Sequence, residues 1–136
     1  GLLHDIGKIG ISENLLNKPG ELTGKEYEEI CKHSEIGYRI VKASENMKEI
    51  SESILSHHEK WDGSGYPRGI KGEEIPIASR IIAITDTYDA MTSDRSYRLA
   101  MPKTDAIEEL IRCKGTQFEP GLVDVFVNEV LSKEDV

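Results

Sequence analysis

Apolar residues recur at intervals of three and four along most of this chain, and no segment alternates convincingly as a half-buried β-strand would. Thr23 and Glu26 have the spacing of a capping box, which predicts that a helix begins there. Residues 61–72 hold four glycines and one proline, so this segment is predicted to be a loop. The sequence therefore predicts an all-α bundle with helices over residues 23–43, 47–59, 77–92, 102–114 and 120–131.

The size of the chain indicates one domain over residues 1–136, because 136 residues are too few for two full cores. The chain begins with Gly1 rather than methionine, so we expect a fragment of a longer protein. It shows no signal peptide and no apolar run near the ~18 residues of a membrane helix, so no membrane contact is expected. The isolated Cys31 and Cys113 suit a reducing, cytoplasmic setting.

The charge balance limits the ligands that the chain can bind. It has 17 Lys and Arg against 25 Asp and Glu, a formal net charge of -8. Such an acidic chain is a poor general binder of a nucleic-acid backbone, so no nucleic acid polymer is expected as a partner. A phosphate ligand would have to be held by a local group of cations or by metal ions.

All histidines of the chain lie beside apolar residues at helical spacing. Each one alone could be a core residue satisfied by hydrogen bonds, but four on inward faces favour metal ligands in a cavity between helices. Neighbouring residues on a helix point about 100° apart, so an adjacent pair suits two ions better than one. A carboxylate has two oxygens and could bridge two metals. The residues concerned are His4, His33, the pair His57-His58 and the carboxylate of Asp5.

The segment 77–92 is apolar around most of its circumference, which predicts a helix buried on all sides. Asp86 lies within it, and a buried carboxylate needs a metal or a cation as a partner. A pair with Arg80 is the alternative to a metal. Asp89 lies one turn further along the same face.

Two further features could serve a phosphate ligand. Lys8 follows Asp5 closely, and Arg95 and Arg98 follow the helix of residues 77–92; such cations could hold phosphate or could be ordinary surface charge. The glycine-rich stretch 61–67 is not a P-loop, because no Gly-Lys-Ser/Thr follows. Because it comes directly after His57-His58, it could form the wall or lid of a site, or it could be a plain connection.

Taken together and in this order, these segments resemble the HD-GYP family, a branch of the HD-domain metal phosphohydrolases. The resemblance covers essentially the whole chain. The matching segments are His4-Asp5-Ile6-Gly7-Lys8, His33, His57-His58-Glu59, Trp61-Asp62-Gly63-Ser64-Gly65-Tyr66-Pro67, Asp86-Thr87-Tyr88-Asp89-Ala90-Met91-Thr92-Ser93 and Arg95-Ser96-Tyr97-Arg98.

The resemblance implies an HD-domain bundle that hydrolyses cyclic di-GMP to pGpG, GMP or both. It implies two or three metal ions, most often iron or manganese, that activate water for attack on phosphorus. A non-hydrolytic cyclic di-GMP receptor is the alternative, and the Gly-Tyr-Pro loop argues against a phosphohydrolase of another nucleotide. The implied metal ligands are His4, Asp5, His33, His57, His58 and Asp86; the implied catalytic residues are Asp5 and Lys8; and the implied substrate-binding residues are Lys8, Tyr66, Asp89, Arg95 and Arg98.

Family domains also have helices before the His-Asp pair, which are missing here. We therefore expect apolar surface to be exposed, partly on the helix of residues 77–92, and the fragment to form a homo-oligomer. The expected partners are an upstream sensor or receiver domain and GGDEF-domain proteins. Glu119 stands where the family commonly has Asp, and Glu is a weaker helix N-cap.

Overall fold

The computed structural model describes residues 2–95 and 98–134, and within these ranges the chain forms helices and no β-strand. The all-α prediction is confirmed. Ser96 and Tyr97 of the Arg95–Arg98 motif lie outside the described residues. In the described part, no helix combines the length and the apolar character that crossing a membrane requires. The helices are α1 (Glu13–Leu16), α2 (Gly24–Cys31), α3 (His33–Lys42), α4 (Lys48–Leu55), α5 (Ile77–Thr92), α6 (Lys103–Arg112), α7 (Pro120–Val125) and α8 (Ser132–Glu134), with short 3-10 turns η1 (Ile6–Gly10), η2 (Glu45–Met47) and η3 (Gly72–Glu74) and a π-helical stretch η4 (Phe126–Leu131).

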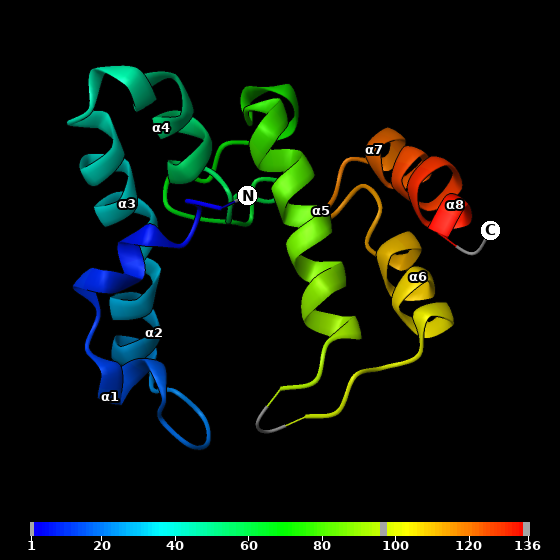
Figure 1. Ribbon diagram of the computed structural model, residues 1–136, viewed down its shortest axis with the longest axis horizontal. Helices are drawn as coiled ribbons and strands as arrows, with labels where there is room; N and C mark the ends of the chain where they lie inside the picture. The colour runs from blue at the N-terminus through cyan, green and yellow to red at the C-terminus, as the bar shows by residue number, and fades with distance from the viewer. Residues whose placement is uncertain (1, 96–97, 135–136) are drawn as a thin grey trace.

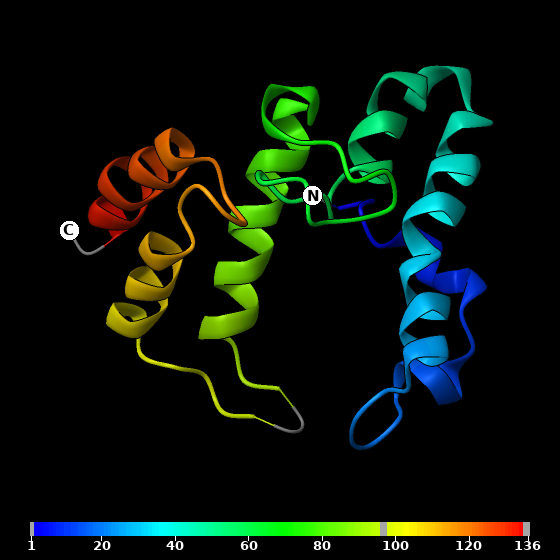
Figure 2. The same ribbon diagram turned by 180° about the vertical axis from the view of Figure 1, so that it is seen from behind.

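The helices form two groups, with the irregular segment 56–76 running between them (Figure 1). In the first group α3 runs antiparallel to α4, and η1 packs against α3. In the second group α5 packs against α6 and α7. Figure 2 shows from behind that the N-terminal segment lies in the middle of the molecule, between the two groups. Residues near the N-terminus are therefore placed close to both α4 and α5.

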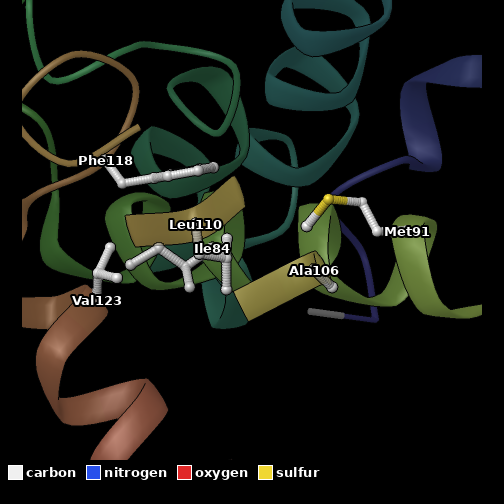
Figure 3. Close-up of a cluster of buried hydrophobic side chains, with 6 residues drawn as sticks. All are labelled: Ile84, Met91, Ala106, Leu110, Phe118 and Val123. Carbon is white, nitrogen blue, oxygen red and sulfur yellow. The ribbon is translucent and has the colours of Figure 1, made fainter. Parts of the chain in front are cut away.

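A cluster of buried apolar side chains fixes the position of α5 within the second group of helices. Figure 3 shows side chains from α5, α6, the following loop and α7 packed together. Each is at most 7% exposed, and burying a large apolar side chain stabilises a fold by about 1.5–3 kcal/mol. This packing sets the position of α5, and with it Asp86. The cluster consists of Ile84, Met91, Ala106, Leu110, Phe118 and Val123.

The predicted helix 23–43 is broken at Lys32 into α2 and α3. The His33 Nδ1 donates to the Ile30 carbonyl oxygen at 2.7 Å, and the Ser34 hydroxyl donates to the Cys31 carbonyl oxygen at 3.1 Å. These side-chain hydrogen bonds compete with the backbone hydrogen bonds of a continuous helix. Such competition is a known cause of helix distortion. The break is therefore a consequence of how His33 is held.

The predicted helix 47–59 is also shorter, because α4 ends at Leu55. The His57 Nδ1 donates to the Ile54 carbonyl oxygen at 2.6 Å, just beyond the end of the helix. His57 and His58 therefore lie in a turn and not on the helical stripe that the sequence predicted. In this turn the His57 and His58 ring centroids lie 4.1 Å apart.

The prediction that the helix of residues 77–92 is buried on all sides is wrong. Ile77 and Ile81 are 51% and 45% exposed, while Ser79, Ile84 and Met91 are buried. The helix α5 packs on α4 along one side and on α6 and α7 along another, and among the described residues nothing covers the face of Ile77 and Ile81. The expected exposure of apolar surface on this helix is therefore observed, whereas the truncation of the domain and the homo-oligomer stay predictions.

The capping box at Thr23 provides a test of local stability. The Thr23 hydroxyl accepts from the Glu26 N–H at 3.3 Å, and the Glu26 carboxylate accepts from the Thr23 N–H at 2.8 Å. Thr23→Ala should therefore lower the free energy of unfolding by about 1 kcal/mol, seen as a midpoint lower by roughly 3–5 °C in thermal unfolding. Thr23→Ser keeps the cap and should unfold like the parent. Equal midpoints for Thr23→Ala and Thr23→Ser would contradict the prediction.

Candidate metal centre

Three separate parts of the chain bring nitrogen and carboxylate ligands to one point. Asp5 precedes η1, His33 begins α3, and His57 and His58 occupy the turn after α4. One ligand atom from each of these residues lies within 4.8 Å of every other. The His33 and His57 side chains are only 2% and 1% exposed, so these two rings are shielded from water.

The histidine rings are held so that their Nε2 atoms converge. Because a carbonyl oxygen can only accept, the Nδ1 atoms of His33 and His57 are the donors, and each Nε2 carries a lone pair. These two Nε2 atoms are 3.3 Å apart, and the His58 Nε2 lies 3.1 Å from the His33 Nε2. Lone pairs facing each other between His33 and His57 gain nothing from a hydrogen bond, whereas a cation between them satisfies both.

The electrostatics of the cluster favour the metal-binding form of the rings. Burial lowers the pKa of His33. Burial, and then the neighbouring His57 and His33, lower the pKa of His58 to about 3. Neutral imidazole is the form that binds a metal ion, so these rings are ready to act as ligands near neutral pH.

The Asp5 carboxylate lies between two groups of side chains. Its Oδ1 is 3.5 Å from the His33 Nε2 and 3.7 Å from the His57 Nε2. Its Oδ2 is 3.3 Å from the His4 Nε2 and 3.1 Å from the Lys8 Nζ. Partial burial opposes ionisation, but the hydrogen bond and positive charge of Lys8 favour the carboxylate, and the pKa of Asp5 lies well below its usual range. Asp5 is therefore a carboxylate with one oxygen turned toward each group.

His4 and Asp86, together with the Asp5 Oδ2, form a second set of candidate ligands. The His4 Nε2 lies 3.3 Å from the Asp86 Oδ1, which joins the N-terminal segment to α5. Contacts of 3.7 Å or less connect all six predicted ligands, four of which converge on one point; their role as metal ligands stays a prediction. The predicted burial of Asp86 is wrong, since its side chain is 45% exposed.

The alternative partner for Asp86, Arg80, is engaged elsewhere. The Arg80 guanidinium donates to the Glu119 carboxylate at 2.7 Å and to the Ile75 carbonyl oxygen at 2.9 Å. Glu119 gives no side-chain cap to α7 and instead accepts this bond, so a residue expected to be a weak cap serves as the partner of a largely buried arginine. This pair ties α5 to the start of α7.

A backbone contact that the sequence analysis did not predict brings Asp5 to His33. A Cβ atom on Gly7 would lie 1.7 Å from the His33 carbonyl oxygen and 2.6 Å from the Gly37 nitrogen. Only glycine allows η1 to approach α3 so closely. The one sequence signal was Gly37 itself, because a glycine inside a helical pattern usually has a packing reason.

The glycine-rich loop folds back on the cluster. The Tyr66 ring stacks on the His58 ring at 4.9 Å with an angle of 18° between their planes. The buried Glu59 carboxylate accepts from the Arg68 N–H at 2.7 Å and so closes the loop. A Cβ atom on Gly65 would lie 2.4 Å from the Lys60 nitrogen, so this position also requires glycine. The loop forms one wall of a cavity beside the cluster.

The predicted phosphate-binding residues are divided between two places. Lys8 lies at the cluster, against Asp5. Asp89 is 72% exposed near the end of α5 and pairs with Arg95 at 3.9 Å, while Arg98 donates to the Ala90 carbonyl oxygen at 2.8 Å. The contacts described for Asp89, Arg95 and Arg98 include none of the six ligands, so their role in substrate binding stays a prediction.

Together, the helical fold and the convergent histidines and carboxylates define a helical protein with a candidate metal site at the junction of two helix groups. A family model described as HD domain matches residues 1–122. The chain belongs to the HD-domain family, which confirms the resemblance seen in the sequence.

The relatives are bacterial phosphodiesterases. The chain is 46% identical to a cyclic di-GMP phosphodiesterase of Thermotoga maritima, over 97% of this chain and 36% of that protein. It is 43% identical to 3'3'-cGAMP-specific phosphodiesterase 2 of Vibrio cholerae, over 92% of this chain and 24% of that protein. A solved cyclic GMP-AMP-specific phosphodiesterase of V. cholerae shares the fold, with a TM-score of 0.73 and 24% identity over 98% of this chain and 37% of that chain. The chain thus spans between 24% and 37% of the length of these proteins.

Proposed function

We propose that this domain is the hydrolytic part of a metal-dependent phosphodiesterase that cleaves cyclic di-GMP to pGpG, GMP or both. The observation that carries the proposal is the Asp5 carboxylate, which turns one oxygen toward each of two ligand groups. A carboxylate placed between two sets of ligands would suit a centre of at least two metal ions.

The residues divide naturally between the ions. His33, His57 and His58 with the Asp5 Oδ1 would hold one ion, and His4 and Asp86 with the Asp5 Oδ2 would hold another. Mixed imidazole and carboxylate ligands suit iron or manganese. When bound, such ions lower the pKa of water and offset the charge of a phosphodiester.

The chain's own side chains then bind and orient the substrate. Lys8 would stabilise negative charge on the phosphate oxygens, because its ammonium group lies beside Asp5. Tyr66 would shape the wall of the cavity next to His58. Asp89, Arg95 and Arg98 would act at the end of α5, where the two arginines could hold a phosphate away from the bond that is cut.

Cyclic di-GMP is the substrate that the relatives support best. Several relatives carry that name, and the Thermotoga relative with 46% identity is among them. We infer that residues 1–136 act as one domain of a longer cytoplasmic protein, controlled by an upstream sensor or receiver domain. We also propose that the protein forms homo-oligomers and interacts with GGDEF-domain proteins.

The test is product analysis with the full-length protein, loaded anaerobically with Fe²⁺ or with Mn²⁺ and incubated with cyclic di-GMP. Chromatography should show linear pGpG, with GMP appearing later or not at all. Binding of cyclic di-GMP without any linear product, with either metal, would contradict hydrolysis and favour a receptor.

A further inference from the structure

A cavity of about 290 Å³ opens directly beside the metal-ligand cluster. Three candidate ligands also line this cavity: His57 and His58 of the cluster, and Asp86, which contacts His4. A phosphodiester held at the cluster therefore places one of its two neighbouring groups in the cavity. For a cyclic dinucleotide, each neighbouring group is a ribose that carries a base.

One part of the wall is aromatic. Tyr27 of α2 and Tyr66 of the glycine-rich loop meet edge to face, with ring centroids 6.3 Å apart. The Tyr66 face is covered by His58, whereas Tyr27 is 53% exposed and can accept a flat ring. Aromatic side chains beside a phosphate site are the usual platform for an unpaired base.

Another part of the wall is polar and comes from two loops joined by backbone bonds. The Trp61 N–H donates to the Gln117 carbonyl oxygen at 3.2 Å, and the Asp62 N–H donates to the Thr116 carbonyl oxygen at 2.9 Å. These bonds hold Lys60 and Gln117 beside the same cavity. Neither residue belongs to the ligand cluster, so the metal centre does not account for them.

Their chemistry distinguishes between the two purines. A lysine ammonium only donates hydrogen bonds, and guanine presents two neighbouring acceptors, N7 and O6. Adenine has a donor amino group in place of O6, so it offers the lysine one acceptor fewer. The Gln117 amide both donates and accepts, and can therefore pair with either base.

We propose that this cavity is a nucleobase subsite that selects guanine, with Tyr27 as the stacking surface and Lys60 and Gln117 reading the edge of the base. The proposal rests on the proposed function, because it takes the phosphodiester of a cyclic dinucleotide to lie at the metal centre. It assigns Lys60 and Gln117 to substrate specificity.

The first test uses the full-length, metal-loaded protein and its Lys60→Met and Gln117→Leu variants. The readout is kcat/KM for cyclic di-GMP divided by kcat/KM for bis(p-nitrophenyl) phosphate, which carries no base. We expect Lys60→Met to lower this ratio about tenfold, and Gln117→Leu to lower it less. Lys48→Met, an exposed lysine at the start of α4, serves as the matched control. An unchanged ratio in both Lys60→Met and Gln117→Leu overturns the proposal.

The second test separates this subsite from the hydrolytic function. Isothermal titration calorimetry measures nucleotide binding directly and needs no reporter group in the cavity. In titrations of the full-length protein with GMP and with AMP, the parent should bind GMP about tenfold more tightly, and Lys60→Met should remove the preference. Equal affinities in the parent overturn the subsite. Absence of cyclic di-GMP hydrolysis with a clear GMP preference overturns only the proposed function.

Discussion

Replacing both His57 and His58 by alanine should remove at least one metal ion and lower the turnover of cyclic di-GMP by a factor on the order of 10³ or more. The His57 Nε2 faces the Asp5 carboxylate at 3.7 Å, and the His58 Nε2 faces the His33 Nε2 at 3.1 Å. Removing both rings leaves His33 and one oxygen of Asp5 for the first ion, which is too few ligands for tight binding.

The measurement is elemental analysis of the full-length protein prepared without chelator, followed by product chromatography. Far-ultraviolet circular dichroism shows whether the double variant is folded. The control Glu108→Gln lies on the exposed side of α6, away from the cluster, and should keep the parent's metal content and turnover. Metal content equal to the parent's in the His57→Ala, His58→Ala variant would show that the ligands are wrongly assigned.

The helical class and most helix positions followed from the sequence because they depend on local periodicity. The segments 77–92, 102–114 and 120–131 all contain helices near the predicted bounds. The short η1 and α1 were not predicted, because four or five residues are too few to show a helical period. The break at Lys32 and the end of α4 at Leu55 were missed because each arises from a histidine bond to a carbonyl oxygen.

The identity of the candidate metal ligands could be predicted from the sequence, but their arrangement in space could not. Ordered motifs identified His4, Asp5, His33, His57, His58 and Asp86, and the structure gathers them. That each Asp5 oxygen faces a different group depends on the backbone contact of Gly7 with His33, which joins residues distant in the sequence. The partners Arg80 and Glu119 are 39 residues apart, so no local sequence pattern predicts their ion pair.

Lys8→Ala should lower turnover of cyclic di-GMP by a factor on the order of 10²–10³ while leaving metal content and affinity for the nucleotide nearly unchanged. A lysine ammonium has no lone pair for a metal, so its place beside Asp5 does not make it a ligand. Its charge is most favourable when negative charge grows on the phosphate oxygens during cleavage. Lys8→Ala should therefore lower kcat more than it changes KM.

The ion pair between Lys8 and Asp5 does not by itself account for so large an effect. The Lys8 side chain is 45% exposed, and pairs this exposed contribute at most about 1 kcal/mol. Lys133→Ala removes a comparable exposed pair with Glu129 at 3.2 Å and should leave kcat unchanged. Lys8→Arg should restore part of kcat, because it keeps the charge but changes its position. Full activity in Lys8→Ala would confine Lys8 to a structural contact with Asp5, whereas a joint loss of metal and turnover would mean that it acts by holding that carboxylate in place.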